Sequence, residues 1–131
     1  MEASARALER SPLPIFCDEG CQRLTDIERI KDSFTGINIK LMKSTGLFEA
    51  KLMLTRAREL GLQTLIGCMT ETSCATMAAA ALAPQFDYVD IDGPWMLAEQ
   101  PFLAPDLKDG RLVLGRQAGL GIHPIHPSTF F

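Results

Sequence analysis

Residues 36–68, GINIKLMKSTGLFEAKLMLTRARELGLQTLIGC, contain the pattern that decides the fold. Residues 36–41 form a short apolar run of the kind found in a buried strand. Residues 47–60 then carry apolar side chains at helical intervals, and the Gly61 that follows is a good helix stop. Residues 63–68 are a second short apolar run. The stretch therefore predicts a strand, a helix and a second strand.

The same alternation continues on both sides of this stretch. Upstream, residues 2–10 are rich in helix-forming side chains and are followed by prolines, so we expect the end of a helix there. A short strand over 13–17 follows. Thr25 and Glu28 then have capping-box spacing for a helix that runs to Phe34. Downstream we expect a helix over 72–82, a strand over 88–92 and a short final strand or hairpin arm over 111–114.

Strands that alternate with helices in this way define the fold class. Successive strands separated by helices require crossover connections, so the sheet is parallel and its faces are covered. The pattern alone predicts an α/β fold and leaves open whether the sheet is doubly wound or a barrel. No Gly-x-Gly-x-x-Gly turn follows the first strand, which gives dinucleotide binding little support.

Composition excludes several classes of function. The chain has 131 residues, of which 47% are hydrophobic and 22% charged, as in an ordinary globular domain. A net charge of −3 without a basic run argues against nucleic acid or an anionic membrane as a partner. No apolar stretch is long enough for a membrane span and no secretory signal is evident, so we expect a cytoplasmic protein. The spacing of its cysteines indicates reduced thiols.

Polar side chains recur where the expected strands end. Asp18 and Glu19, Lys40, Glu71, and the pair Asp90 and Asp92 all lie at or just past these points. In a parallel barrel the carboxyl ends of the strands form one rim, and that rim carries the active site in characterised barrel enzymes. We therefore expect these groups to converge on one face.

Carboxylates beside a lysine suit the removal of a proton next to a carboxylate. A hard cation such as Mg²⁺ binds carboxylate oxygens, and the amine can act as the base. Simpler interpretations also stand: Asp18 and Glu19 can belong to a solvated loop, and Lys40 can form a structural ion pair. Asp90 and Asp92, two residues apart on a strand, would face the same side and repel unless a cation lies between them.

Four segments together resemble a known family. They are PIFCDE at 14–19, GINIKLMK at 36–43, GCMTET at 67–72 and DIDGP at 90–94. In this order they resemble the last four barrel strands of dipeptide epimerases, in the muconate-lactonising branch of the enolase superfamily. The resemblance runs from about Leu8 to Ile122. It implies the C-terminal half of a (β/α)8 TIM barrel, with about four parallel strands and their covering helices.

The resemblance also implies roles for particular residues. Asp18 resembles one of three ligands of a Mg²⁺ cofactor, and Lys40 one of two catalytic lysines that face each other across the substrate α-carbon. Cys68 would contact the substrate, and Asp90 and Asp92 would bind the free ammonium of a dipeptide such as L-Ala-D/L-Glu. Glu71 matches a recurrent acid of this branch to which we assign no step.

Half of the catalytic and metal-binding residues that the resemblance implies have no counterpart in this sequence. A full barrel needs about 250 residues, and the strand with the opposing lysine and the other two metal ligands are absent from the sequence. We expect the chain to be a fragment of such an epimerase, with weak metal binding and no activity alone. One alternative is an N-acylamino acid racemase or cycloisomerase of the same superfamily. Another is a non-catalytic or assembly-dependent half-barrel module.

The expected domain covers residues 1–122, and 123–131 read as a C-terminal tail. Half a barrel leaves two strand edges and an apolar interior uncovered, which favours pairing with another chain. A homodimer or a separate N-terminal half is the expected partner.

Overall fold

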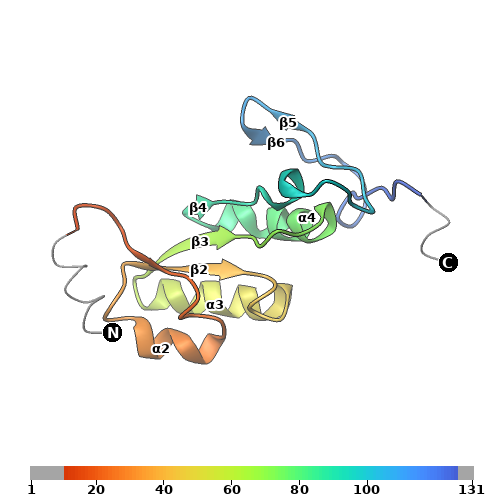
Figure 1. The fold of residues 1–131 in the computed structure, drawn as a ribbon. Coiled ribbons are helices and arrows are strands. Elements are labelled where there is room, and N and C mark those ends of the chain that lie inside the picture. The colour runs from red at the N-terminus through yellow and green to blue at the C-terminus, as the bar shows by residue number, and fades with distance from the viewer. Residues whose placement is uncertain (1–10, 127–131) are drawn as a thin grey trace.

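The computed structural model describes residues 11–126, and a four-stranded parallel sheet runs through its centre (Figure 1). The strands are β1 (Phe16–Cys17), β2 (Gly36–Lys40), β3 (Gln63–Gly67) and β4 (Tyr88–Val89), in the order β1-β2-β3-β4. Sheet order follows chain order, as in a barrel built from repeated strand–helix units. The predicted α/β class is confirmed. The helix expected over residues 2–10 lies outside the described residues.

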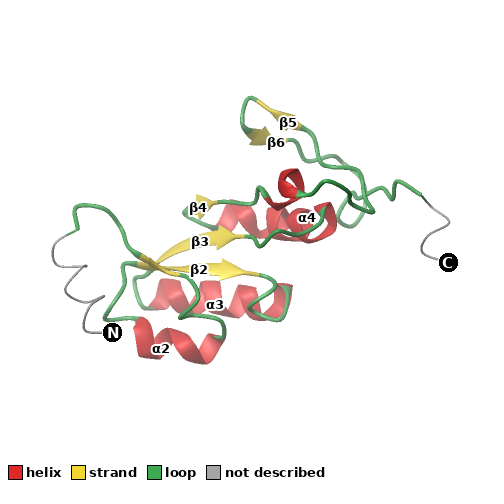
Figure 2. Ribbon diagram, viewed as in Figure 1, coloured by secondary structure: helices red, strands yellow, loops and turns green. Residues whose placement is uncertain are grey.

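Helices connect the strands and lie on one face of the sheet (Figure 2). They are α2 (Ile27–Ile30), preceded by a 3₁₀ turn at Leu24–Asp26; α3 (Leu47–Glu59); and α4 (Ser73–Leu82), followed by a 3₁₀ turn at Ala83–Gln85. Ile37, Ile39 and Ile66 point into this layer and are fully buried. Their packing partners on α3 and α4 include Ala50, Met53, Ala57 and Ala79. The small alanines allow helix and sheet to approach closely, which explains the alanine-rich sequence of α4.

Three element boundaries differ from those expected. The first strand covers only Phe16–Cys17, because Leu13 is 72% exposed and lies before the ladder begins. The helix expected to run to Phe34 ends at Ile30. The expected capping contact of Thr25 is replaced by one from Asp26, whose carboxylate accepts hydrogen bonds from the backbone N–H groups of residues 22 and 23 at the start of the 3₁₀ turn. The last strand ends at Val89, since the chain turns into a 3₁₀ segment (Gly93–Met96) with a proline in its first turn.

The sheet is strongly curved toward the side without helices. The rings of Phe16 on β1 and Tyr88 on β4 meet edge to face, with centroids 5.4 Å apart. In a flat sheet these outer strands would be separated by three strand spacings, about 14 Å. The Phe16 ring lies over Gly36, where a β-carbon would come within 2.6 Å of it. This curvature is that of a barrel segment and confirms the predicted part-barrel.

Beyond β4 the chain forms a hairpin and returns toward α4. Strands β5 (Leu107–Lys108) and β6 (Arg111–Leu112) pair antiparallel across Asp109 and Gly110, which both have positive φ, as a two-residue hairpin turn requires. A hairpin arm was expected here. Residues 123 and 125 form backbone hydrogen bonds with 103 and 101, so this part of the expected tail is held against the chain. No helix among the described residues is long and apolar enough to cross a membrane.

Candidate functional site

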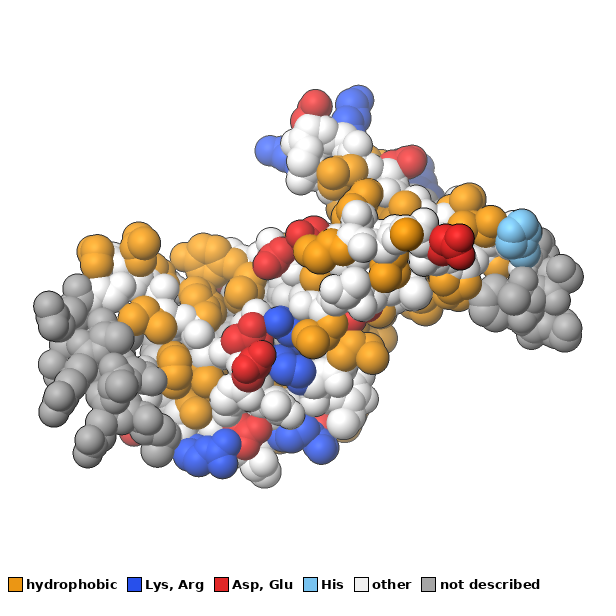
Figure 3. All heavy atoms as spheres, in the orientation of Figure 1, with side chains coloured by type: hydrophobic (Ala, Val, Ile, Leu, Met, Phe, Trp, Pro, Cys, Tyr) orange, Lys and Arg blue, Asp and Glu red, His pale blue; other side chains and the backbone are white. Residues whose placement is uncertain are grey.

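The predicted site residues lie at the carboxyl ends of four successive parallel strands. Asp18 follows β1, Lys40 ends β2, Cys68 follows β3 and Asp90 follows β4. We call the side of the sheet opposite the helices the open face. Because the isoleucines of β2 point to the helices, alternation directs Asn38 and Lys40 to the open face. Figure 3 shows acidic and basic side chains gathered at the end of β2, with further acidic side chains at the end of β4.

Asp18 bridges two lysines. Its Oδ2 pairs with Lys40 Nζ at 2.9 Å and its Oδ1 with Lys43 Nζ at 2.5 Å. The lysine side chains are only 16% and 11% exposed, whereas that of Asp18 is 42% exposed. Burial acts to raise the pKa of Asp18, but hydrogen bonds from Lys43 and Lys40 outweigh it, and the pKa is lowered. Asp18 is therefore a charged carboxylate at neutral pH, held between two ammonium groups.

Lys43 is a contributor that the sequence analysis missed. Its ammonium donates to the backbone oxygens of Asp18 at 2.6 Å and Asn38 at 3.2 Å, besides Asp18 Oδ1. Its position follows from the turn after β2, in which the N–H groups of Lys43 and Ser44 bond to the carbonyl of Lys40. Lys43 thus ties the end of β1 to the end of β2. The signal available in the sequence was a second lysine three residues after Lys40 in a tight turn.

Cys68 and Asp92 form a second polar contact at the next strand ends. The Cys68 thiol donates to Asp92 Oδ1 at 3.5 Å. Burial is the main reason that the pKa of Cys68 is raised, which keeps the thiol protonated and able to donate. No hydrogen bond or ion pair among the described residues joins this contact to the Asp18–Lys40 pair.

Asp90 and Asp92 are both exposed and line one hollow of about 350 Å³. The hollow also has apolar walls, from Ile91, Trp95 and Leu112. The Asp90 backbone N–H bonds to the carbonyl of Ile66, which extends the ladder by one residue and fixes the start of this segment. Two carboxylates that form no ion pair among the described residues, at one hollow with apolar walls, suit a cationic group attached to an apolar body.

Glu71 lies in the loop between β3 and α4 and is buried, with 8% of its surface exposed. Neither of its carboxylate oxygens has a hydrogen-bond partner among the described residues. Burial raises the pKa of Glu71, while the Met69 backbone and the charge of Lys40 act in the opposite direction. It is a buried acid that forms no ion pair among the described residues.

These residues do not form a complete metal site. Among the described residues no group of three or more His, Cys, Asp or Glu side chains could hold a metal ion. Asp18 is a single carboxylate, and both of its oxygens already contact ammonium groups. A hard cation needs several oxygen ligands, so the residues present fit one ligand of a Mg²⁺ site and not the site itself.

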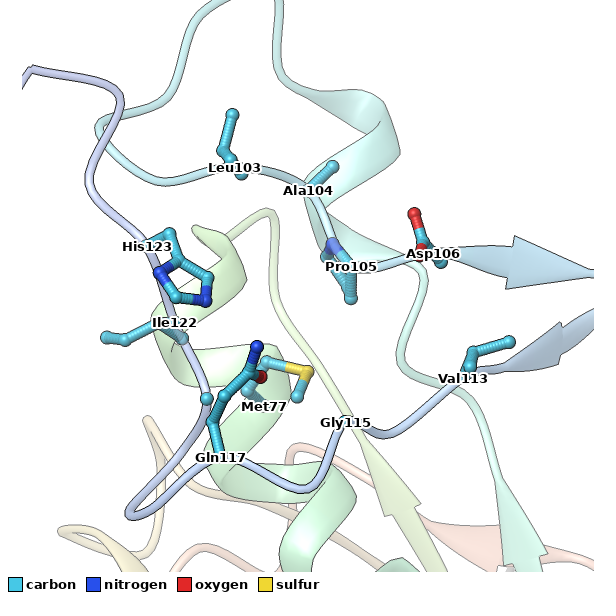
Figure 4. Close-up of a pocket in the computed structure, with 11 residues that line it drawn as sticks. Met77, Leu103, Ala104, Pro105, Asp106, Val113, Gly115, Gln117, Ile122 and His123 are labelled. Atoms are coloured by element: carbon cyan, nitrogen blue, oxygen red, sulfur yellow. The ribbon is translucent and has the colours of Figure 1, made fainter.

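Another hollow, of about 250 Å³, lies between α4 and the C-terminal segment (Figure 4). Met77 points into it from α4, facing Leu103, Pro105 and Ile122. None of the predicted site residues lines it. We therefore do not include it in the candidate site.

Comparison with known proteins identifies the class of protein that this fold and site define. The profile of the family described as enolase C-terminal domain-like matches residues 1–127. The chain belongs to this family.

Individual relatives show which members of the family the chain resembles. The chain is 45% identical over 117 residues to an L-Ala-D/L-Glu epimerase of Bacteroides thetaiotaomicron, covering 89% of this chain and 30% of the relative. It is 39% identical over 121 residues to an L-Ala-D/L-amino acid epimerase of Flavobacterium johnsoniae, covering 92% of this chain and 36% of the relative.

A solved structure of a mandelate racemase/muconate lactonizing protein from Herpetosiphon aurantiacus superposes with a TM-score of 0.83 at 33% identity. The superposition covers 94% of this chain and 36% of that one. The chain thus spans about a third of the length of these relatives.

Proposed function

We propose that this chain carries one side of the active site of a dipeptide epimerase, which inverts the α-carbon of a dipeptide such as L-Ala-D/L-Glu by proton transfer. The observation that carries the proposal is the arrangement of Asp18, Lys40, Cys68 and Asp90 at the ends of four adjacent parallel strands. The epimerase relatives support the choice of reaction.

Lys40 is the proposed base. Its unprotonated amine would take the α-proton of the substrate and become an ammonium, while the electron pair left on the α-carbon is delocalised into the adjacent carboxylate. A base on the opposite side of the substrate must then return a proton to the other face. No residue for that second step is assigned in this chain, so the chain supplies one half of the transfer.

Asp90 and Asp92 are proposed to bind the free α-ammonium of the dipeptide. Both are exposed at the same hollow, and the contact from Cys68 holds the Asp92 carboxylate in place. Two carboxylates give a cationic substrate group an attraction that a neutral acylated amine would lack. This feature favours a dipeptide over an N-acylamino acid or a cycloisomerase substrate.

Mg²⁺ is the proposed cofactor of the completed barrel, with Asp18 as one of its ligands and the others supplied from outside the described residues. Its chemistry would be to stabilise negative charge on the substrate carboxylate. The free cysteines of the described residues fit a reducing compartment such as the cytoplasm.

The substrate class is tested by changing Asp92 to Asn in a barrel completed with the N-terminal part of an epimerase relative. We expect most of the turnover of L-Ala-D-Glu to be lost, because the ammonium loses a counter-charge. Turnover of an N-acylglutamate, which has no free ammonium, should be unaffected by the same change. A variant that keeps full dipeptide activity would refute the proposed role of Asp92.

A further inference from the structure

The hollow beside Asp90 and Asp92 has apolar walls that the proposed reaction does not use. Trp95, on the 3₁₀ segment after β4, is 43% exposed, and Leu107, on the hairpin, is 54% exposed. Both line the hollow together with the two carboxylates. Large apolar side chains that gather at a hollow with a few polar groups are typical of a ligand-binding surface. The walls therefore fit an apolar group that enters the hollow with a cation.

The hairpin turns its apolar face toward this hollow. Leu107 and Leu112 are directly paired across β5 and β6, so their side chains lie on the same face, and both line the hollow. The second pair, Lys108 and Arg111, lies on the opposite face because successive side chains of a strand alternate, and neither lines the hollow. The hairpin thus covers the hollow with leucines and keeps its basic side chains away from the two carboxylates.

The carboxylates remain available to a ligand. Asp90 and Asp92 are exposed and form no ion pair among residues 11–126. The thiol of Cys68 donates to Asp92, which orients this carboxylate without neutralising it, because a thiol is an uncharged donor. The next residue, Gly93, is packed so closely that a β-carbon there would lie 2.5 Å from the Met69 carbonyl. Negative charge is therefore held at one side of a hollow whose other walls are apolar.

The first residue of a peptide matches this arrangement. Its ammonium and its side chain branch from the same α-carbon, so an ammonium bound by the carboxylates brings the side chain against the apolar walls. The hollow has a volume of about 350 Å³. A water molecule occupies about 30 Å³ in the liquid. The hollow therefore has room for a side chain much larger than the methyl group of alanine.

We propose that this hollow is the subsite for the first residue of the dipeptide. Trp95, Leu107 and Leu112 are its specificity-determining residues and select a large apolar side chain at that position. The walls and the carboxylates all lie within residues 89–112, so this chain forms the subsite by itself. The inference rests on the proposed binding of the ammonium by the two carboxylates.

The test uses the chain alone and the fluorescence of Trp95, its only tryptophan. The probe is L-leucinamide at about pH 6.5, where its α-amino group is protonated. We expect a saturable change in Trp95 emission. L-Alaninamide should bind about tenfold more weakly, because it buries less apolar surface. N-Acetyl-L-leucinamide has no ammonium and should bind about tenfold more weakly or not at all, because a hydrogen bond between charged groups is lost.

Substitutions locate the binding. Leu107→Asn should weaken the binding of leucinamide about tenfold, because a polar group replaces part of the wall. Val113→Asn is the matched control on the same hairpin: this residue does not line the hollow, and the affinity should not change. Saturation-transfer NMR of the leucinamide methyl signals is the second readout where Trp95 emission does not respond. Equal affinity for leucinamide and its N-acetyl derivative, or no binding by either method, would overturn the proposal.

The outcome is separable from the proposed function, which is measured as dipeptide turnover in a completed barrel. A chain that binds leucinamide as expected, with no turnover by the completed barrel, would leave the subsite standing and remove the reaction. Turnover by the completed barrel without binding of leucinamide to the chain would refute the subsite alone.

Discussion

Asp18 links the carboxyl ends of β1 and β2. Its carboxylate and its backbone carbonyl both contact Lys43, and the carboxylate also reaches Lys40. Hydrogen bonds to charged groups contribute more than neutral ones, each about 1.5–3 kcal/mol when partly buried. The polar residues of the candidate site therefore also stabilise the fold at its strand ends.

Removing the Lys43 amine should show this directly. We expect Lys43→Met to lower the free energy of unfolding by about 2 kcal/mol, because two backbone carbonyls and the Asp18 carboxylate lose a donor. Urea denaturation measures the change. Lys51→Met, at an exposed position on α3, is the matched control and should stay within about 0.5 kcal/mol of the parent chain. Equal effects of both changes would contradict the structural role of Lys43.

The lowered pKa of Asp18 gives the pairing a defined pH dependence. Because the folded state holds this carboxylate charged, its contribution is present above the ordinary value of 3.8 and is lost as the pH falls through the lowered value. The side chain is 42% exposed, so solvent screening keeps the effect modest. Urea unfolding of the parent chain and Asp18→Asn should differ at pH 6 and converge toward pH 3. A difference that grows in acid would have the wrong sign.

Some residues of the site could be predicted from their position in the sequence alone. Asp18, Lys40, Asp90 and Asp92 were marked by following apolar runs, and the structure brings Asp18 and Lys40 into contact. For Lys43 the sequence offered only a second lysine in a tight turn, and its contact with Asp18 depends on how that turn folds back onto β1. The burial of Glu71 likewise depends on the approach of residue 93 from a separate loop.

At the level of elements, β2 and β3 are the central and longest strands of the parallel sheet. The predicted β2, β3 and α3 agree with the structure to within one residue at each end, because their apolar patterns coincide with buried ladders. The outer strands β1 and β4 are shorter than expected. Their apolar runs continue past the paired residues, as the exposed Leu13 shows, and periodicity cannot distinguish a paired from an unpaired extended segment.

Gly36 tests the curvature of the sheet. A β-carbon there would lie 2.5 Å from the Gln63 carbonyl and 2.6 Å from the Phe16 ring, neither of which can move without shifting a strand or a ring. We expect Gly36→Ala to cost about 1–3 kcal/mol of stability, measured by urea denaturation. In Gly115→Ala the β-carbon meets only the end of the Gln117 side chain, so little loss is expected. A tolerated Gly36→Ala would contradict the tight contact between Phe16 and β2.

For the whole molecule, both edges of the sheet, at β1 and β4, have no pairing strand among residues 11–126. In β4 both residues are about half exposed, with Tyr88 at 45% and Val89 at 50%. Exposed strand edges with apolar side chains pair readily with another chain. The family's barrel closes on itself, and this chain spans about a third of its relatives. We propose that a second copy or a separate N-terminal half covers these edges.

Sedimentation velocity of the purified chain measures that association. We expect a species larger than the monomer, or a monomer that forms a complex when the N-terminal part of an epimerase relative is added. A monomer that is stable at high concentration and ignores the added half would count against both partners. Substituting lysine for Val89 should weaken the association, because a charged edge strand resists pairing.

Lys40 and its neighbours are proposed to form one side of an epimerase site that needs the rest of a barrel. Exchange of the α-proton of L-Ala-D-Glu in deuterated water, followed by proton NMR with Mg²⁺ present, tests it most directly. We expect no exchange by the chain alone, exchange by the completed barrel, and none by the completed barrel with Lys40→Met. Turnover by the pure chain, or a completed barrel indifferent to the loss of Lys40, would contradict it.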